Sequence, residues 1–412
     1  MQYLADEMAI PPPPDLKAIH YQLPEEKIAK YPLKERSQSK MLVYQNGTVT
    51  DRHFYQLHTA LPKESTLFFN NTKVIPARLF FQNDFGAHIE IFLLTPVAPT
   101  TLVSESMITT GSVTWKCVIG NLKKWRDDVI LDKEFVIGGQ HITLSVSLVD
   151  REQSLVCFFW EPWHLAFVNI VEQAGKTPLP PYLQREAEPQ DKERYQTVYS
   201  TSEGAAAAPT AGLHFTPEVF KSLDEAQFKR VELTLHVNAG TFQPLRTDDA
   251  RDHEMHQEQI EVNGDLIKNV ITAKNIISVG TTSMRTLESL YWFGVRLARG
   301  NTEFAIEKLE IYPENKEQLP SRQEAFTRIL DFMKQQEIDQ LFGTTEIMIM
   351  PGYDFKVCDG LITNFHQPGS TLLLLISAFI GSDWEKVYKH ALSNDYRFLS
   401  YGDSSLLLPK VY

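Results

Sequence analysis

The spacing of apolar residues changes once along the chain, near residue 160. From 74 to about 160, short apolar runs such as HIEIFLL, HITLSVSLV and LVCFFW recur, turn residues separate them, and helical spacing is absent. Beyond 160, strand-like and helix-like stretches alternate, which is typical of a layered α/β structure. Evenly spaced short strands favour a small β-barrel or sandwich instead. The sequence therefore predicts an α/β domain, residues 1–73 and 161–412, interrupted by a β domain, residues 74–160.

The alternating part predicts strands and helices of ordinary length. Thr216 is a favourable N-cap and Pro217 suits a first helical position, so a helix should begin there. Residues 161–175 look helical, with Gly175 as the stop. A four-proline stretch at 11–14 predicts a stiff tail or strap. The expected strands are 66–70, 231–237, 276–280, 346–350, 360–365 and 396–402, and the expected helices are 217–229, 265–274, a helix from about 283, 322–340, 370–380 and 383–393.

The 412 residues are 43% hydrophobic and 22% charged, as in an ordinary globular protein with a sizeable core. The three cysteines, Cys117, Cys157 and Cys358, have no CxxC spacing, which favours free thiols in a reducing compartment and offers no zinc site. The longest apolar run, 372–380, is far shorter than the roughly 20 residues of a membrane-spanning helix. The N-terminus lacks the pattern of a signal peptide, so we expect a cytoplasmic protein with no membrane partner.

Basic residues gather in two places, although the formal net charge of −12 argues against a general nucleic-acid binder. KVIPAR contains Lys73 and Arg78, and NLKKWR surrounds a tryptophan with Lys123, Lys124 and Arg126. Basic residues with an interleaved aromatic can hold phosphates and stack a base. A solvated hairpin face is the simpler interpretation of the second stretch.

Three segments of the α/β part share a strand, a short polar loop and a helix N-terminus. VELTLHV leads into NAGTF, IISVG into TTSMRTLESL, and GLITNF into HQPGSTLLLL. Helix N-termini offer unpaired amide N–H groups, and loops at the carboxyl ends of strands form the usual ligand crevice of α/β sheets. Each loop alone could be an ordinary connection. Together they suggest a polar crevice lined by threonine, serine, histidine and asparagine.

Two further stretches carry histidines. In AAAAPTAGLHFT, residues 205–216, small residues lead to His214, so a flat ligand or another backbone can approach closely. A packed core crossing with a satisfied histidine explains this stretch equally well. His253 and His256 lie beside two glutamates in DHEMHQE but lack the HExxH spacing. A hydrogen-bonding or acid–base role, or a plain surface loop, is therefore favoured over a metal site.

Several long and unusual stretches match a known family. They include LPEEKIAKYPLKERSQSKMLV, FFNNTKVIPARL, PLPPYLQREAE, AAPTAGLHFTPE, LTLHVNAGTFQP, VGTTSMRTLESL, MPGYDFKVCDGLITNFH and YRFLSYGD. On these stretches the chain resembles the S-adenosylmethionine:tRNA ribosyltransferase-isomerase family of queuosine biosynthesis. The resemblance implies a three-layer α/β domain interrupted by a small β-barrel domain. It also implies an enzyme without cofactor or metal, for which S-adenosylmethionine is a consumed substrate.

The family's reaction transfers the ribose of S-adenosylmethionine to the aminomethyl group of 7-aminomethyl-7-deazaguanine at the tRNA wobble position. Epoxyqueuosine forms, and adenine and methionine are released. The sulfonium acidifies the C5′ protons of the ribose, so a histidine base can begin the reaction, and a hydrogen-bond donor helps adenine to leave. The resemblance implies that four catalytic residues converge on the donor's ribose and adenine: His214, His236, His253 and His256.

The binding residues that the resemblance implies fall into two sets. For S-adenosylmethionine they are Thr210, Thr281, Thr282, Ser283, Arg285, Asn364, His366 and Ser370, with Arg285 as a bidentate clamp on the methionine carboxylate. For tRNA they are Lys73, Arg78, Lys123, Lys124, Arg126 and Arg185. The expected partners are S-adenosylmethionine and a tRNA that carries the precursor base. The oligomeric state is left open, with a monomer favoured.

The chain departs from the family pattern in four places. HVNAGTF stands where HVGAGTF is usual, NLKKWR replaces a basic, proline-containing segment, MPGY stands where a tyrosine usually precedes the proline, and residues 296–345 are longer than in short members. We therefore expect a long-form relative with an altered RNA preference. Two alternatives stay open: a paralogue that acts on another RNA or a free nucleoside, and a non-catalytic RNA- or nucleotide-binding protein.

Overall fold

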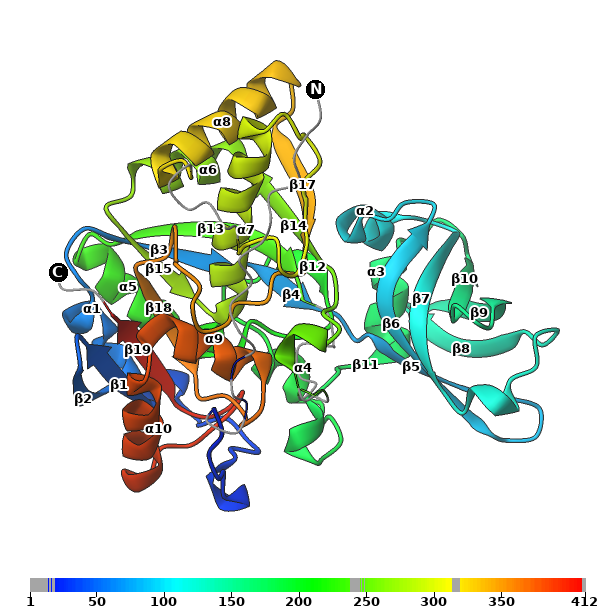
Figure 1. Ribbon diagram of the computed structural model, residues 1–412. Coiled ribbons are helices and arrows are strands. Elements are labelled where there is room, and N and C mark those ends of the chain that lie inside the picture. Colours follow the sequence, from blue (N-terminus) through cyan, green and yellow to red (C-terminus); the bar gives the residue numbers. More distant parts are fainter. Residues whose placement is uncertain are drawn as a thin grey trace.

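The computed structural model describes residues 14, 16, 19–237, 245, 247, 249–312 and 319–409. Most of the predicted strap at 11–14 and the NAGTF loop at 238–242 lie outside these residues. Figure 1 shows a larger α/β part and a smaller β-rich part beside it. The predicted mixed α/β fold with a β insertion is confirmed.

A ten-stranded mixed sheet forms the centre of the α/β part, in the order β16-β17-β14-β13-β3-β15-β18-β19-β1-β2. Its strands are β1 (Lys40–Gln45), β2 (Thr48–His53), β3 (Ser65–Asn70), β13 (Lys229–His236), β14 (Glu258–Asn263), β15 (Asn275–Val279), β16 (Ala305–Ile306), β17 (Gln340–Thr345), β18 (Gly360–Asn364) and β19 (Ser404–Leu408). The four neighbours β13, β3, β15 and β18 are parallel to one another. Their carboxyl ends therefore meet at one edge of the sheet, where α/β proteins place their ligands.

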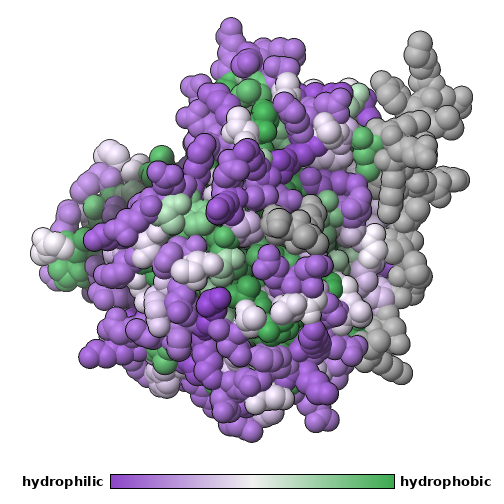
Figure 2. Space-filling model, turned by 90° about the vertical axis from the view of Figure 1, so that its left-hand side faces the viewer, coloured by the Kyte–Doolittle hydropathy of each residue, from purple (hydrophilic) through white to green (hydrophobic). Residues whose placement is uncertain are grey.

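Helices cover both faces of this sheet and make three layers. Phe69 of β3 packs in one core with Val219, while its neighbour Phe68 packs in another core with Leu287, because successive strand residues point to opposite faces. The first face carries α1 (Leu57–Ala60) and α5 (Pro217–Glu225), and the helices of the second core are α6 (Gly264–Thr272), α7 (Thr281–Ala298), α8 (Arg322–Gln335), α9 (Thr371–Ile380) and α10 (Asp383–Ser393). Figure 2 shows that the outer side of the α/β part is mostly hydrophilic, with hydrophobic residues in scattered areas.

The smaller part is a seven-stranded antiparallel sheet with its own core. Its order is β11-β5-β6-β7-β10-β9-β8, and it curls into a half-barrel (Figure 1). The strands are β5 (Arg78–Gln82), β6 (His88–Ala98), β7 (Ser112–Gly120), β8 (Leu131–Ile137), β9 (Gln140–Asp150), β10 (Leu155–Glu161) and β11 (Gly175–Lys176). Two helices pack beside it, α2 (Val103–Ile108) and α3 (Phe167–Ala174). Helix α3 follows residue 160 in the chain and yet packs in the core of this smaller part. The domain boundary expected at residue 160 therefore stays a prediction.

The stretch between the two parts is built from short elements. β4 (Thr72–Val74) pairs with β12 (Ser202–Ala205) in a parallel ladder, and α4 (Asp191–Arg194) and the 3-10 helix Thr210–His214 lie between the longer elements. Thr216 caps α5 as expected, because its side-chain oxygen accepts the N–H of Val219. Gly175 ends α3 as expected.

Two expected strands are wrong. Residues 347–350 are buried, but 346–350 form no strand; the amides of Glu346 and Met348 bond to the carbonyls of Ile306 and Lys308, next to the two-residue strand β16. Residues 396–402 form a turn in which Leu399 has φ 69°, so the last strand comes later, as β19. The apolar content predicted burial correctly in both places, but the strands that form, β17 and β19, lie a few residues away.

No helix among the described residues is long and apolar enough to cross a membrane.

Candidate active site

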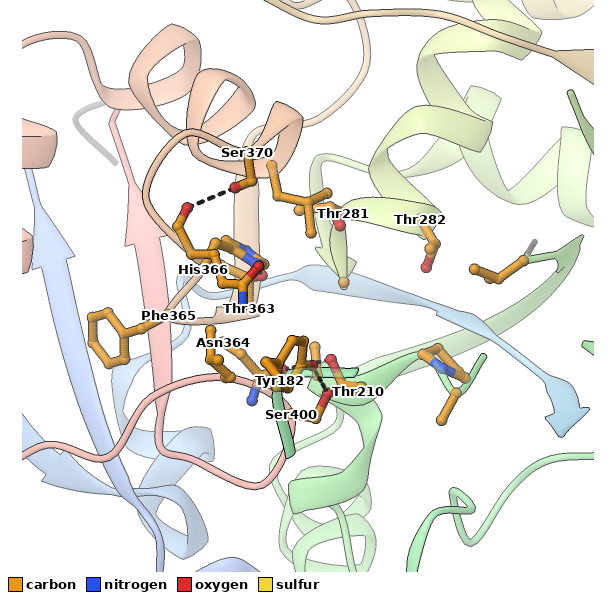
Figure 3. Close-up of a pocket in the computed structure, with 18 residues that line it drawn as sticks. Tyr182, Thr210, Thr281, Thr282, Thr363, Asn364, Phe365, His366, Ser370 and Ser400 are labelled. Carbon is orange, nitrogen blue, oxygen red and sulfur yellow. Dashed lines mark hydrogen bonds between the residues drawn. The ribbon is translucent and has the colours of Figure 1, made fainter. Parts of the chain in front are cut away.

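A pocket opens at the carboxyl edge of β15 and β18 and encloses about 680 Å³, counting its open mouth. Figure 3 shows Thr281 and Thr282 at the start of α7, and His366 and Ser370 before α9, all around this pocket. The other lining residues are Tyr182, Ala208, Pro209, Thr210, Ala211, Val237, Gly280, Thr363, Asn364, Phe365, Gln367, Leu372, Leu399 and Ser400. We call this the β15–β18 pocket.

The start of α7, which forms one wall of the pocket, offers hydrogen-bond donors that the described residues leave unpaired. Gly280 precedes this helix with φ 89° and ψ 151°, a conformation that glycine alone adopts readily, and no side chain caps the helix. The hydroxyl of Thr282 is buried, and no group in the described part of the chain forms a hydrogen bond with it. By contrast, the side chain of Ser370 caps its own helix, α9, by accepting the N–H of Leu373. The start of α7 is therefore the better place for an anionic or oxygen-rich ligand group.

Behind the pocket, a chain of hydrogen bonds fixes Asn364. Thr210 Oγ1 donates to Asn364 Oδ1 at 3.0 Å, and Asn364 Nδ2 donates to His214 Nε2 at 3.1 Å. His214 Nδ1 then donates to Ser39 Oγ at 2.8 Å. Asn364 lines the pocket, whereas His214 lies behind it and lines a smaller cavity on its other side. The geometry thus makes His214 a support for Asn364.

Burial keeps two histidines neutral. It lowers the pKa of His214 to about 3, and the nearby charges of Arg397 and Arg36 act in the same direction. Burial alone lowers the pKa of His366 to about 3. Nε2 of His366 lies 2.9 Å from Thr363 Oγ1. At neutral pH these rings are hydrogen-bonding groups without charge.

A second pocket adjoins the first. It encloses about 500 Å³ with its mouth, and Leu372 lines both pockets. His253, His256, Glu258 and Arg285 lie in its wall. We call it the Arg285 pocket. Sequence positions far apart therefore meet at the start of α9.

Arg285 is buried with only part of its hydrogen-bonding capacity used. Its Nη1 donates to Glu258 Oε2 at 2.7 Å. Its Nε and Nη2, the two nitrogens that together bind a carboxylate side-on, are buried and have no hydrogen-bond partner among the described residues. A buried guanidinium with two unused donors is costly unless a ligand satisfies them.

Three of the residues predicted to be catalytic or to bind S-adenosylmethionine lie outside both pockets: His214, described above, Ser283 and His236. Ser283 donates its hydroxyl to the carbonyl of Val279, the last residue of β15. His236 Nε2 lies 3.0 Å from Glu261 Oε1, which also accepts the hydroxyl of Ser104 in α2. Burial would raise the pKa of Glu261, but its contacts with His236 and Ser104 hold it below the usual value. His236 therefore sits where the half-barrel part meets the α/β part, and the four histidines do not line one pocket.

Three of the predicted tRNA-binding cations are paired with acids from other elements. Arg185, with 11% of its side chain exposed, binds Asp191 through both Nη atoms. The remaining two are partly exposed: Lys73 pairs with Glu203 and Glu172, and Arg78 pairs with Glu90. Pairing leaves these three side chains less charge to offer to phosphates.

The NLKKWR turn differs from the prediction. Trp125 is buried, with Nε1 donating to the carbonyl of Val129, so it cannot stack a base. Arg126 is paired with Asp128. Lys123 and Lys124 are exposed and, within the described part of the chain, form no ion pair.

Some lining residues escaped the sequence prediction. Tyr182, whose hydroxyl bonds to that of Ser400, comes from a proline-rich stretch without periodicity. Glu258 ends the DHEMHQE stretch and begins a strand, but no role was predicted for it, and its contact with Arg285 marks it as part of the site. Within the described residues, no group of three or more His, Cys, Asp or Glu side chains could hold a metal ion.

The fold and the adjoining pockets define a mixed α/β protein with polar pockets at the carboxyl ends of parallel strands, the usual place of a small-molecule site in this class. The family model for queuosine biosynthesis proteins matches residues 16–407, and the chain belongs to this family. An S-adenosylmethionine:tRNA ribosyltransferase-isomerase from Dichelobacter nodosus is 35% identical over 398 residues, 94% of each chain. One from Halothermothrix orenii is 37% identical over 396 residues, 94% of this chain and 98% of the relative. The crystal structure of S-adenosylmethionine tRNA ribosyltransferase from Thermotoga maritima is 26% identical, covers 95% of this chain and 100% of its own, and gives a TM-score of 0.45.

Proposed function

We propose that this protein transfers and isomerises the ribosyl group of S-adenosylmethionine onto 7-aminomethyl-7-deazaguanine at the tRNA wobble position. The product is epoxyqueuosine-tRNA, and adenine and methionine are released. S-adenosylmethionine is consumed as a substrate, so no resident cofactor is required. Because the three cysteines are free thiols, we assign the activity to the reducing cytoplasm.

The observation that carries this proposal is the unused fork of Arg285 beside the β15–β18 pocket. The donor has a carboxylate at one end and a purine nucleoside at the other. Nε and Nη2 of Arg285 suit the carboxylate, and the uncapped start of α7, with the unpaired hydroxyl of Thr282, suits oxygen atoms of the ribose. Asn364, held by Thr210, would bind adenine in the wider pocket.

The residues that transfer protons are assigned from the same placement of S-adenosylmethionine in the two pockets. With the methionine end in the Arg285 pocket, the sulfonium and C5′ lie toward His253 and His256, and we assign the base to one of these two. His214 then acts through Asn364, and His236 through its contact with Glu261, which keeps the half-barrel part in place. The precursor amine is itself a nucleophile, so the protein needs none.

The test is transfer of labelled ribose from S-adenosylmethionine to tRNA with and without the precursor base. Only the precursor-bearing tRNA should accept the label, and release of adenine should match the label transferred. Transfer to neither tRNA would refute the activity. Adenine release with tRNA that lacks the precursor would favour another acceptor.

The role of Arg285 is tested with R285K, which keeps the charge beside Glu258 but removes the fork. Two lost charge-assisted hydrogen bonds predict an affinity for S-adenosylmethionine roughly a hundredfold weaker, measured by calorimetry. The matched control is R328K, on the exposed side of α8, which should bind as the wild type does. Wild-type affinity in R285K would contradict the assignment. H253Q and H256Q, compared for the rate of adenine release, should then identify the base.

A further inference from the structure

The β5–β6 hairpin, at the end of the half-barrel where β7 finishes, presents an aromatic side chain to solvent. Phe85 lies at its tip with 89% of its surface exposed, and it is absent from the apolar core of this part. Single exposed apolar residues are common and need no explanation. Phe85 differs because of the groups held beside it.

Asn83 builds the turn that carries Phe85. Its Oδ1 accepts the N–H groups of Phe85 at 3.0 Å and Ala87 at 2.9 Å. Its Nδ2 donates to the carbonyl of Lys124 at 2.9 Å, in the neighbouring turn. A second link joins the same turns, because Asn121 Nδ2 donates to the carbonyl of His88 at 2.9 Å. The aromatic ring and the two lysines of NLKKWR therefore belong to one ordered surface.

Some charged side chains of this surface form ion pairs within the described residues, and others do not. Arg126 and Arg151 are paired with Asp128 and Asp127, which leaves these four side chains with little net charge. Lys123 and Lys124 are exposed and have no such pairing in the described residues. Asp84, exposed beside the aromatic ring, is the opposing charge, so the balance of the two turns is positive on an otherwise acidic protein.

We propose that this surface, Phe85 with Lys123 and Lys124, binds an unpaired nucleotide of the substrate RNA. Phe85 stacks on the base, and the two lysines contact the flanking phosphates. Exposed aromatic rings combined with nearby positive charge are the means by which proteins hold single-stranded nucleic acid without reading its sequence. Trp125, the aromatic residue within the basic stretch, cannot do this because it is buried. The inference rests on the proposed function, which supplies the RNA.

Binding of labelled precursor-bearing tRNA, measured at several salt concentrations, tests this surface. F85A should raise Kd roughly tenfold with an unchanged salt dependence, since stacking carries no charge. F85Y keeps a stacking ring and should bind nearly as the wild type does. The double variant K123A/K124A should reduce the slope of log Kd against log salt by about 1.4, and D84N should tighten binding. The loss in F85A should appear in the KM for tRNA.

Two controls separate the possible results. W163A removes an exposed aromatic residue from the loop after β10, where β7 begins, at the other end of β7 from the Lys123 turn, and should leave Kd unchanged. The thermal midpoint of F85A should equal that of the wild type, because the ring packs against no core. If the wild type transfers ribose but F85A binds tRNA equally well, or W163A is equally impaired, the surface assignment is wrong and the activity stands. If the wild type transfers no ribose, the proposed function itself fails.

Discussion

Acidification should destabilise this protein through two buried histidines, His214 and His366. Burial lowers the pKa of each to about 3, against 6.5 for an ordinary histidine, and Arg397 and Arg36 add to the effect at His214. As pH falls below about 6.5, the unfolded chain takes up a proton at each position while the folded chain takes up neither. Their contribution to stability is therefore complete above that pH and is lost progressively toward pH 3.

The size of the effect follows from the two pKa values. One pH unit corresponds to about 1.4 kcal/mol for each histidine. Between pH 6.5 and about 5, each therefore costs about 2 kcal/mol and the pair about 4 kcal/mol. His214 is 4% exposed and His366 8% exposed, so solvent screens little of this difference. A loss of this size is a large fraction of the roughly 5–15 kcal/mol that stabilises an ordinary domain.

Urea unfolding at about pH 7, 6 and 5 measures this contribution. The free energy of unfolding should fall with pH about 2 kcal/mol less in H214Q and in H366Q than in the wild type, and about 4 kcal/mol less in the double variant. The variants are compared by how steeply the free energy of unfolding changes with pH. This comparison cancels the cost of each substitution at neutral pH and the carboxylate titration that all variants share. H141Q, at an exposed position of β9, is the control and should keep the wild-type slope. Equal slopes in all variants would refute the argument from burial.

Three other substitutions test the support of the site. E258Q should cost about 3 kcal/mol in urea unfolding, because it leaves Arg285 buried without its ionic partner; a loss below about 1 kcal/mol would show that the pair is dispensable. G280A should cost about 1–3 kcal/mol and weaken S-adenosylmethionine binding, since φ 89° with ψ 151° suits glycine alone; unchanged affinity would contradict the role given to the start of α7. E288A should cost at least about 4 kcal/mol, because this buried carboxylate accepts hydrogen bonds from the hydroxyl of Tyr353 and from three successive backbone amides before β18; wild-type stability would show that water replaces it.

The polar crevice was predictable from local patterns. IISVG and GLITNF read as strands that lead into helix starts, and because β15 and β18 are parallel neighbours, their loops meet at one edge. Thr281, Thr282 and His366 were expected in a ligand site on that ground, and they line one pocket. The caps at Thr216 and Gly175 also follow from residues a few positions apart.

What each polar side chain does was not predictable in this way. Whether a histidine faces a ligand or supports another residue depends on its partners, and Ser39 lies 175 positions from His214. Likewise, the charge that Lys73 can offer to a phosphate depends on its partner Glu203, 130 positions away in the sequence.

By itself, the sequence determined the family, the four parallel central strands and the main helices of the α/β part, and the edge at which polar loops gather, because periodicity and capping act over a few neighbouring residues. Only the tertiary structure decided that Trp125 is buried while Phe85 is exposed, that Arg185 is neutralised, and that Arg285 keeps two donors unused. Burial and pairing depend on which remote segments pack against a side chain. That information is carried by the three-dimensional arrangement and by no stretch of the chain alone.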